Sequence, residues 1–444
     1  MEAREKVWRW LSTIKYHSEL SKEAPSVAHH TPLVPDLFTP PHSESDRHIN
    51  KSRMQTPQKH SRSEGDIDND ETPTNAQRGS VHVQDARMSS PSKRSRTGRS
   101  DTDLSSTDSS TTSARSARKL RIIQSLTVPI NHKSIGQGSI DDETDLLVTA
   151  LRRCAAGFET VPNQELDMVK AKFRDDVDLE QNVGYGADSQ RARLGDTLPL
   201  PWVDMIRLEA EKCCQEDDFE PGWNSSNQGA ILAMATYLST YCGKVTSANI
   251  TTARILGEFL PTATGNEHIP GRMVDFALCV EPDQCSDFQS LPLRIPGRTT
   301  LNHTDYSPTA SRPIAISIET KRHGVDRPKG QLQLDVWVSA HFNWLQSMQS
   351  ASTGVLVRPL PVLPLLFVQG SIWFVGFAQR LSTEIGGATI IWREILLGDV
   401  RRPSGVYRVL AALLHLIDWI GSVYAPWFAG ALASYHTLRP HSRP

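Results

Sequence analysis

Net charge is almost absent from this sequence. Its 444 residues carry 48 Lys and Arg against 50 Asp and Glu, a formal charge of −2. This balance excludes a protein that coats nucleic acid through overall positive charge, so any such contact has to be local. Apolar residues are also scarce, at 38% of the chain. That share is low for a globular protein, so a long polar segment must dilute a folded part.

Paired cysteines and an apolar leader are missing as well. The 6 cysteines include no C-x-x-C pair. The first twenty residues are rich in charge and lack the apolar core of a secretion signal. Both absences predict a reducing compartment, the nucleus or the cytoplasm.

One uncharged stretch, Leu360 to Ala378, has the length of a membrane span. Pro361, Pro364 and the break at residues 369–371 divide it into two runs of strand length, each rich in large apolar residues. This pattern predicts a buried hairpin instead of a membrane helix. We therefore expect no membrane association.

The first 118 residues differ in composition from the rest of the chain. Residues 1–20 place Val7, Trp10, Leu11 and Ile14 on one helical face, which predicts a short amphipathic helix. Residues 21–118 have scattered apolar residues, recurring prolines and many Ser and Thr. Such a segment cannot bury enough apolar surface to offset its ordering entropy, so we predict a disordered linker.

Two basic clusters stand among the serines of this linker and at its end, over Ser90–Arg99 and Ser113–Arg121. They fit a nuclear-import signal or a tail that touches nucleic acid, and they fit a solvated linker of mixed charge equally well. With the first interpretation, the protein is nuclear.

Residues 119–444 have the apolar density of one folded domain. The expected elements are helices over residues 204–215 and 224–241, strands near 245–255, 272–280 and 313–320, a helix over 328–348, a hairpin over 363–378 and a helix over 403–423. The order helix, three strands, helix, strand predicts an α/β fold in which helices flank a central sheet.

Three charged residues stand out on two of the expected strands. Alternation along PIAISIETK, residues 313–321, sends Glu319 and Lys321 to the same face. Asp275 is the only acidic residue in the preceding strand, GRMVDFALCV. Charges on apolar strands are costly unless they meet each other, a metal or a ligand.

If these two strands are neighbours, Asp275 and Glu319 supply the carboxylate oxygens that Mg²⁺ or Mn²⁺ prefers. A metal there and the ammonium of Lys321 would support hydrolysis of a phosphodiester. The residues alone leave an alternative open, in which Glu319 and Lys321 form an ordinary ion pair and Asp275 is a hydrogen-bonded turn residue.

Several segments, taken together, resemble the PD-(D/E)XK nuclease-like domain found in many fungal proteins of uncharacterised function. They are EPGWNSSNQGAILAMA, ITTARILGEFLP, GRMVDFALCV, RPIAISIETKRHG, QLQLDVWVSAHFNWL and YAPWF. The resemblance runs from about Leu120 to the C-terminus. It implies a mixed sheet with the restriction-endonuclease-like α-β-β-β-α-β core, DNA or RNA as partner, and Mg²⁺ or Mn²⁺ as cofactor.

The same resemblance assigns site residues. It makes Asp275 and Glu319 the metal-binding carboxylates and Lys321 the signature lysine, all three catalytic. Gln333 falls at a Gln-x-x-x-aromatic position on the helix behind the site, which implies a contact with the water or the phosphate. Glu220 corresponds to a helix-borne carboxylate that some members add.

Two departures from the family pattern bear on activity. Val274 replaces the proline that gives the motif its name, and Asn227 and Gln228 stand where the family has a helix pattern with histidine. We predict a metal-dependent nuclease acting on DNA or RNA. The alternative is a catalytically inactive nuclease fold that binds nucleic acid or protein.

Residues around the predicted site have less specific patterns. A basic rim follows the second carboxylate, made of Lys321, Arg322, His323, Arg327 and Lys329. It suits phosphate binding and also an ordinary solvated loop. Asn302 and His303 precede the same strand, and we expect His303 to be structural.

Overall fold

The computed structural model describes Ile123 and residues 125–181, 183–263, 271–324, 327–349, 358–381 and 387–438. All of them belong to the compact unit that runs from Ser105 to Pro444. The amphipathic helix expected over residues 1–20, the disordered linker expected over 21–118 and both basic clusters lie outside the described residues.

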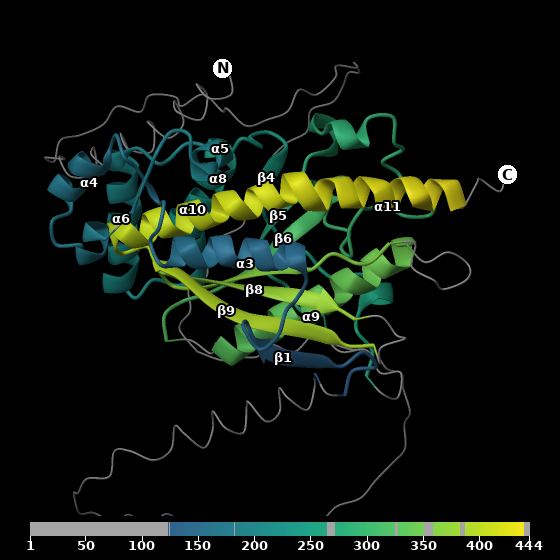
Figure 1. The fold of residues 1–444 in the computed structure, drawn as a ribbon. Coiled ribbons are helices and arrows are strands. Elements are labelled where there is room, and N and C mark those ends of the chain that lie inside the picture. Colours follow the sequence, from purple (N-terminus) through teal and green to yellow (C-terminus); the bar gives the residue numbers. More distant parts are fainter. Residues whose placement is uncertain are drawn as a thin grey trace, which may run out of the picture. The chain divides into compact units, whose positions relative to one another are not determined.

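Within the described part of the chain, a seven-stranded mixed sheet forms the centre of the domain (Figure 1). Its order is β1-β9-β8-β7-β6-β5-β4. The pairs β6–β7 and β1–β9 are parallel, and the other neighbours are antiparallel. The strands are β1 (Ile130–Ser134), β4 (Val245–Asn249), β5 (Phe276–Val280), β6 (Ile314–Lys321), β7 (Leu363–Gln369), β8 (Ile372–Arg380) and β9 (Thr389–Asp399). A separate parallel pair joins β2 (Val161–Pro162) to β3 (Gly184–Tyr185).

Helices cover both faces of this sheet. In Figure 1, α3 (Asp142–Ala155) and α10 (Pro403–Trp419) lie across one face and α9 (Arg327–Gln349) lies on the other. The remaining helices are α4 (Leu166–Lys172), α5 (Gln190–Leu194), α6 (Leu200–Gln215), α7 (Glu220–Trp223), α8 (Gly229–Leu238) and α11 (Ala425–Leu438). The order α8-β4-β5-β6-α9-β7 confirms the expected α-β-β-β-α-β core within a flanked mixed sheet.

Two expected elements differ from the observed ones near the site. The helix expected over residues 224–241 begins earlier, with α7 at Glu220, continues through a π-helical turn over Asn224–Gln228, and ends with α8 at Leu238. The strand expected over residues 272–280 begins only at Phe276, so Asp275 precedes it. Asp275 is nevertheless tied to both neighbouring strands, because its carbonyl accepts from Ile250 N–H and its N–H donates to Ile318.

The uncharged stretch Leu360–Ala378 contributes β7 and β8, which pair antiparallel as the expected hairpin. Gly370 turns the chain between them with φ +57°, a backbone conformation that favours glycine. Among the described residues, one helical stretch, Pro403–Thr437, is long and apolar enough to cross a membrane. Since 67% of its most apolar window is buried inside the domain, it has the character of a core helix.

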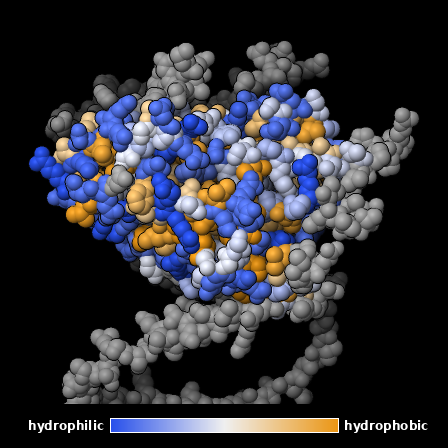
Figure 2. All heavy atoms as spheres, viewed as in Figure 1, coloured by the Kyte–Doolittle hydropathy of each residue, from blue (hydrophilic) through white to orange (hydrophobic). Residues whose placement is uncertain are grey.

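The surface over α3 is the most apolar part of the face shown in Figure 2, where hydrophobic residues gather near the middle. Leu146 of α3 and Leu396 of β9 are among the exposed large apolar side chains of the described residues. Hydrophilic residues surround this region (Figure 2).

Candidate active site

Glu319 and Lys321 lie at the carboxyl end of β6, which runs between β5 and β7. The hydroxyl of Ser317, two residues earlier, accepts a hydrogen bond from Trp337 of α9 at 2.9 Å. The stem of Lys321 also meets α9, because a Cβ placed on Gly330 would lie 3.1 Å from Lys321 Cγ. Ser317, Glu319 and Lys321 therefore share the face covered by α9, as alternation predicts.

Three hydrogen bonds fix the carboxylate of Asp275 at the end of β6, where its negative charge acts on Glu319. The N–H and the hydroxyl of Thr320 both lie 2.9 Å from Asp275 Oδ2. The side-chain amide of Asn224, in the π-helical turn, donates to Asp275 Oδ1 at 3.3 Å. The adjacency of the two strands is thus as expected, and the fixed orientation of Asp275 comes from residues that sequence analysis had not selected.

The Lys321 ammonium lies among three oxygens. Its Nζ is 2.6 Å from Glu319 Oε1 and 3.0 Å from Glu220 Oε2, and it donates to the Thr320 carbonyl at 2.7 Å. An ammonium has three N–H donors, and the hydrogen bonds to Glu220 and to the Thr320 carbonyl use two of them. Glu220, the first residue of α7, is therefore part of the same cluster. We call Asp275, Glu319, Lys321 and Glu220 the carboxylate-lysine cluster.

Burial shifts the protonation equilibria of this cluster. Glu319 is 0% exposed, and its burial raises its pKa well above the usual range, assisted by the negative charge of Asp275 and opposed by Lys321. Burial also raises the pKa of Glu220. For Lys321, burial alone lowers the pKa, but the charges of Glu319, Glu220 and Asp275 outweigh it and raise the pKa. Two carboxylates contact the ammonium and the charge of Asp275 also acts on it, so carboxylates outnumber ammonium groups in this cluster.

The carboxylate oxygens of this cluster fit a divalent cation whose coordination is completed by other ligands. Across the described ranges, no three His, Cys, Asp or Glu side chains gather closely enough to hold a metal by themselves. However, Glu319 Oε2 is buried without a hydrogen-bond partner in the described residues. Mg²⁺ is commonly bound through one or two carboxylates together with waters and a substrate phosphate. Glu319 and Asp275 are the residues that would hold such an ion here.

Gln333 of α9 was expected to touch water or phosphate, and it lies beside the chain segment that leads to Asp275. Its Nε2 donates to the carbonyl of Met273 at 3.1 Å. Its Oε1 is buried and lacks a hydrogen-bond partner among the described residues. The side-chain amide thus links α9 to the segment that precedes Asp275. A direct contact of Gln333 with substrate stays a prediction.

The basic rim divides into residues with different partners. Arg322 lies 3.7 Å from Asp217 and places its guanidinium 5.4 Å from the ring centre of Phe219. Arg327 instead pairs with Glu394 of β9 and stacks on Phe374. Arg322 thus contacts residues that directly precede Glu220, whereas Arg327 is turned toward β8 and β9.

The interpretation of His303 as structural agrees with its surroundings. Its ring is 0% exposed and lies 4.8 Å from His341 and 4.5 Å from Trp337, centre to centre. Burial lowers the pKa of His303 well below its usual range and that of His341 to about 3. Both rings are therefore neutral packing elements behind the sheet.

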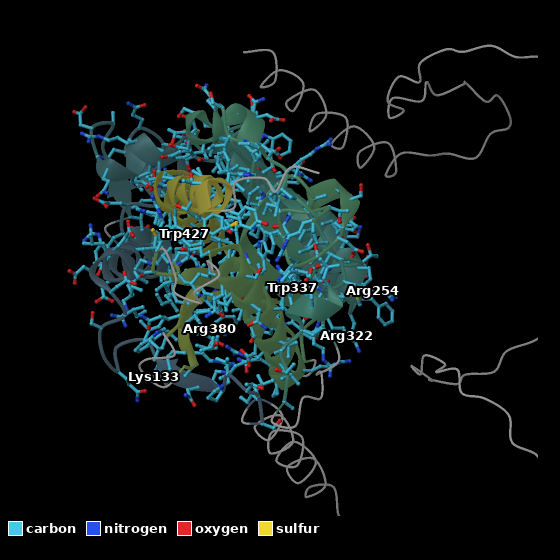
Figure 3. All side chains as sticks on the ribbon, turned by 90° about the vertical axis from the view of Figure 1, so that its right-hand side faces the viewer. Lys133, Arg254, Arg322, Trp337, Arg380 and Trp427 are labelled. Carbon is cyan, nitrogen blue, oxygen red and sulfur yellow. The ribbon has the colours of Figure 1, made fainter. Side chains whose placement is uncertain are left out.

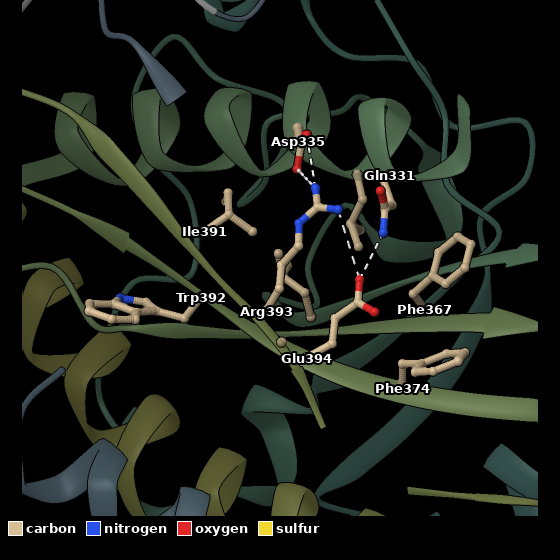
Figure 4. Close-up of a pocket in the computed structure, with 11 residues that line it drawn as sticks. Gln331, Asp335, Phe367, Phe374, Ile391, Trp392, Arg393 and Glu394 are labelled. Atoms are coloured by element: carbon tan, nitrogen blue, oxygen red, sulfur yellow. Dashed lines mark hydrogen bonds and ion pairs between the residues drawn. The ribbon is translucent and has the colours of Figure 1, made fainter. Parts of the chain in front are cut away.

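A second polar cluster, which sequence analysis missed, fastens α9 to β9 (Figure 4). Arg393 donates to the buried Asp335 at 3.4 Å, and Gln331 donates to Glu394 at 2.8 Å. His132 of β1 lies 3.1 Å from Asp335. The pocket between these side chains measures about 30 Å³, room for about one water. Its size and its bonded carboxylates indicate an anchor for α9.

The comparison with protein families agrees with this geometry. Residues 168–425 match the family model of the PD-(D/E)XK nuclease superfamily. This range covers more than half of the chain and includes the core from α8 to β7 and every residue of the carboxylate-lysine cluster. No curated protein and no solved structure matched the chain. The chain belongs to the PD-(D/E)XK nuclease superfamily.

Proposed function

We propose that this protein is a Mg²⁺- or Mn²⁺-dependent nuclease that hydrolyses phosphodiester bonds in DNA or RNA. The observation that carries the proposal is the carboxylate-lysine cluster, in which a buried Glu319 keeps one oxygen without a hydrogen bond next to Asp275 and Lys321. Membership of the superfamily supports a nuclease-like fold, and the cluster supplies the groups that hydrolysis requires.

Each residue of the cluster has a separate role in this proposal. Asp275 and Glu319 hold the divalent cation, with Asp275 fixed in place by Thr320 and Asn224. When bound, such an ion acidifies a water and offsets the charge of the phosphate. Lys321 orients the attacking water and stabilises negative charge, because its ammonium is held between Glu319 and Glu220. Glu220 positions the lysine.

The test is cleavage by the purified full-length chain. Labelled single- and double-stranded DNA and RNA are incubated with Mn²⁺, with Mg²⁺ or with EDTA. We expect cleavage of at least one substrate with metal and none with EDTA. The matched control is Glu143→Gln, which neutralises an exposed carboxylate on α3 and should leave cleavage unchanged.

Nucleic-acid binding without cleavage under any metal condition would contradict the proposal. The protein would then be an inactive nuclease fold that serves as a binding module. Nuclear localisation also belongs to the proposal, and it depends on the basic clusters at Ser90–Arg99 and Ser113–Arg121. Relocation of a fluorescent fusion after both clusters are neutralised would support it.

A further inference from the structure

An exposed phenylalanine adjoins the carboxylate-lysine cluster. Phe219 directly precedes Glu220 and is 70% exposed, at the N-terminal cap of α7. Large aromatic rings are usually buried, and a phenylalanine at the start of a helix gains nothing from capping, which needs a side-chain oxygen. The packing of this domain therefore does not explain an aromatic ring in solvent at this position.

A guanidinium accompanies this ring. Arg322 directly follows Lys321, and its Cζ lies 5.4 Å from the ring centre of Phe219. The partner carboxylate of Arg322, Asp217, is 3.7 Å away and 85% exposed. Such an exposed ion pair contributes little to stability, so another anion can readily replace Asp217 as the partner of Arg322. Figure 3 shows Arg322 near the outer edge of the molecule, whereas the buried Trp337 lies toward its interior.

The chain places both groups one residue from the cluster. Glu220 and Lys321 meet at 3.0 Å, and their chain neighbours Phe219 and Arg322 meet beside them. An aromatic face and a cation thus stand next to the position where the phosphate would be hydrolysed. Bases stack on exposed aromatic rings and arginine contacts the backbone of single strands. A base inside a duplex has both faces covered by its neighbours, so only an unpaired base presents a free face.

We propose that Phe219 and Arg322 form a stacking platform for an unpaired base next to the scissile phosphate, and that the preferred substrate is a single strand of DNA or RNA. This inference rests on the proposed nuclease function for its cleavage readout. The platform itself is also testable by binding alone, because stacking does not require hydrolysis.

The chain offers a matched control pair. Phe158 is 42% exposed and carries the guanidinium of Arg153 at 5.6 Å from its ring centre, but it follows α3 and is not a neighbour in sequence of any cluster residue. Phe219→Ala and Phe158→Ala therefore remove the same kind of surface pair at two places. Phe219→Trp keeps an aromatic face and serves as the rescue.

The experiment measures single-strand and duplex binding by fluorescence anisotropy, and cleavage of the same oligonucleotides with Mn²⁺. We expect Phe219→Ala to weaken single-strand binding roughly 5- to 150-fold, the range for losing one stacked base, with little change on duplex. Phe158→Ala should match the wild type and Phe219→Trp should retain binding. Melting temperatures should be equal, since both phenylalanines are exposed.

The two proposals fail in different ways. Single-strand binding that is unchanged in Phe219→Ala, or lost equally for single strand and duplex, overturns the platform even if cleavage persists. Loss of binding in Phe219→Ala in a protein that cleaves nothing supports the platform and overturns the nuclease.

Discussion

Lys321→Met tests how strongly the buried lysine holds the carboxylate-lysine cluster together. Methionine keeps an unbranched stem against Gly330 but removes the ammonium that lies 2.6 Å from Glu319 and 3.0 Å from Glu220. Glu319 would then be a fully buried carboxylate with no countercharge beside it. Removing one partner of a buried ion pair costs about 3–5 kcal/mol. For a folded domain of about 320 residues, at about 2.1 cal/mol/K per residue, the melting temperature should fall by roughly 4–7 °C.

The stability lost in Lys321→Met should depend on pH, because burial raises the pKa of Glu319. Between its unfolded and folded pKa values the native state binds more protons than the unfolded state, so lowering the pH stabilises the fold. The destabilisation by Lys321→Met should therefore be large near about pH 8 and small near about pH 5. The assay is urea unfolding followed by tryptophan fluorescence at both pH values.

A double variant separates charge from packing. Glu319→Gln/Lys321→Met has no buried charge at this pair, so it should recover much of the stability lost in the single variant. Equal stability of Lys321→Met and the wild type near about pH 8 would refute the reasoning. The same loss at both pH values would refute it too, since Glu319 would then not titrate as its burial requires.

Three further predictions concern Glu319, Asn224 and the boundary of the folded domain. In EDTA, Glu319→Gln should melt at a higher temperature than the wild type, with a gap that widens as pH rises. The variant removes the carboxylate that burial and Asp275 disfavour, and it leaves Lys321 paired with Glu220. A lower melting temperature at every pH would contradict this. Asn224→Ala removes the amide that donates to Asp275 and should lower the unfolding free energy by about 1–3 kcal/mol. Unchanged urea unfolding would show that Thr320 alone orients Asp275. Limited proteolysis should remove residues 21–118 and leave a fragment starting between about Leu120 and Asp142, whereas a resistant fragment beginning near Met1 would contradict the predicted boundary.

Sequence patterns identified the core of the fold because its signals are local. Alternation along β6 distinguishes a face with Ile314, Ile316 and Ile318 from the face with Glu319 and Lys321. The proline and glycine breaks likewise separate β7 from β8. In contrast, β1 was missed because only Ile130 among its five residues is buried, and its partner β9 lies more than 250 residues later. A short edge strand with mostly exposed side chains has no periodic pattern to detect.

The residues that hold the carboxylate-lysine cluster in place were less predictable from the sequence than Asp275, Glu319 and Lys321. Asp275, Glu319 and Lys321 stand out because charges interrupt apolar strands. Asn224 and Thr320 carry no such signal, since they act through side-chain hydrogen bonds to residues far apart in sequence. The resemblance to the family pointed to Glu220, but its ion pair with Lys321 spans 101 residues. Gln333 was placed on the correct helix, and its bond to Met273 depends on how α9 packs.

Comparison of cleavage rates between the wild type and Glu319→Gln in saturating Mn²⁺ tests the central claim most directly. The variant replaces the buried oxygen that lacks a partner with a neutral amide of nearly the same shape, so the fold should be preserved. We predict that the cleavage rate falls by roughly two to three powers of ten while the variant stays folded. Cleavage by Glu319→Gln at the wild-type rate would show that the carboxylate-lysine cluster is not the catalytic site.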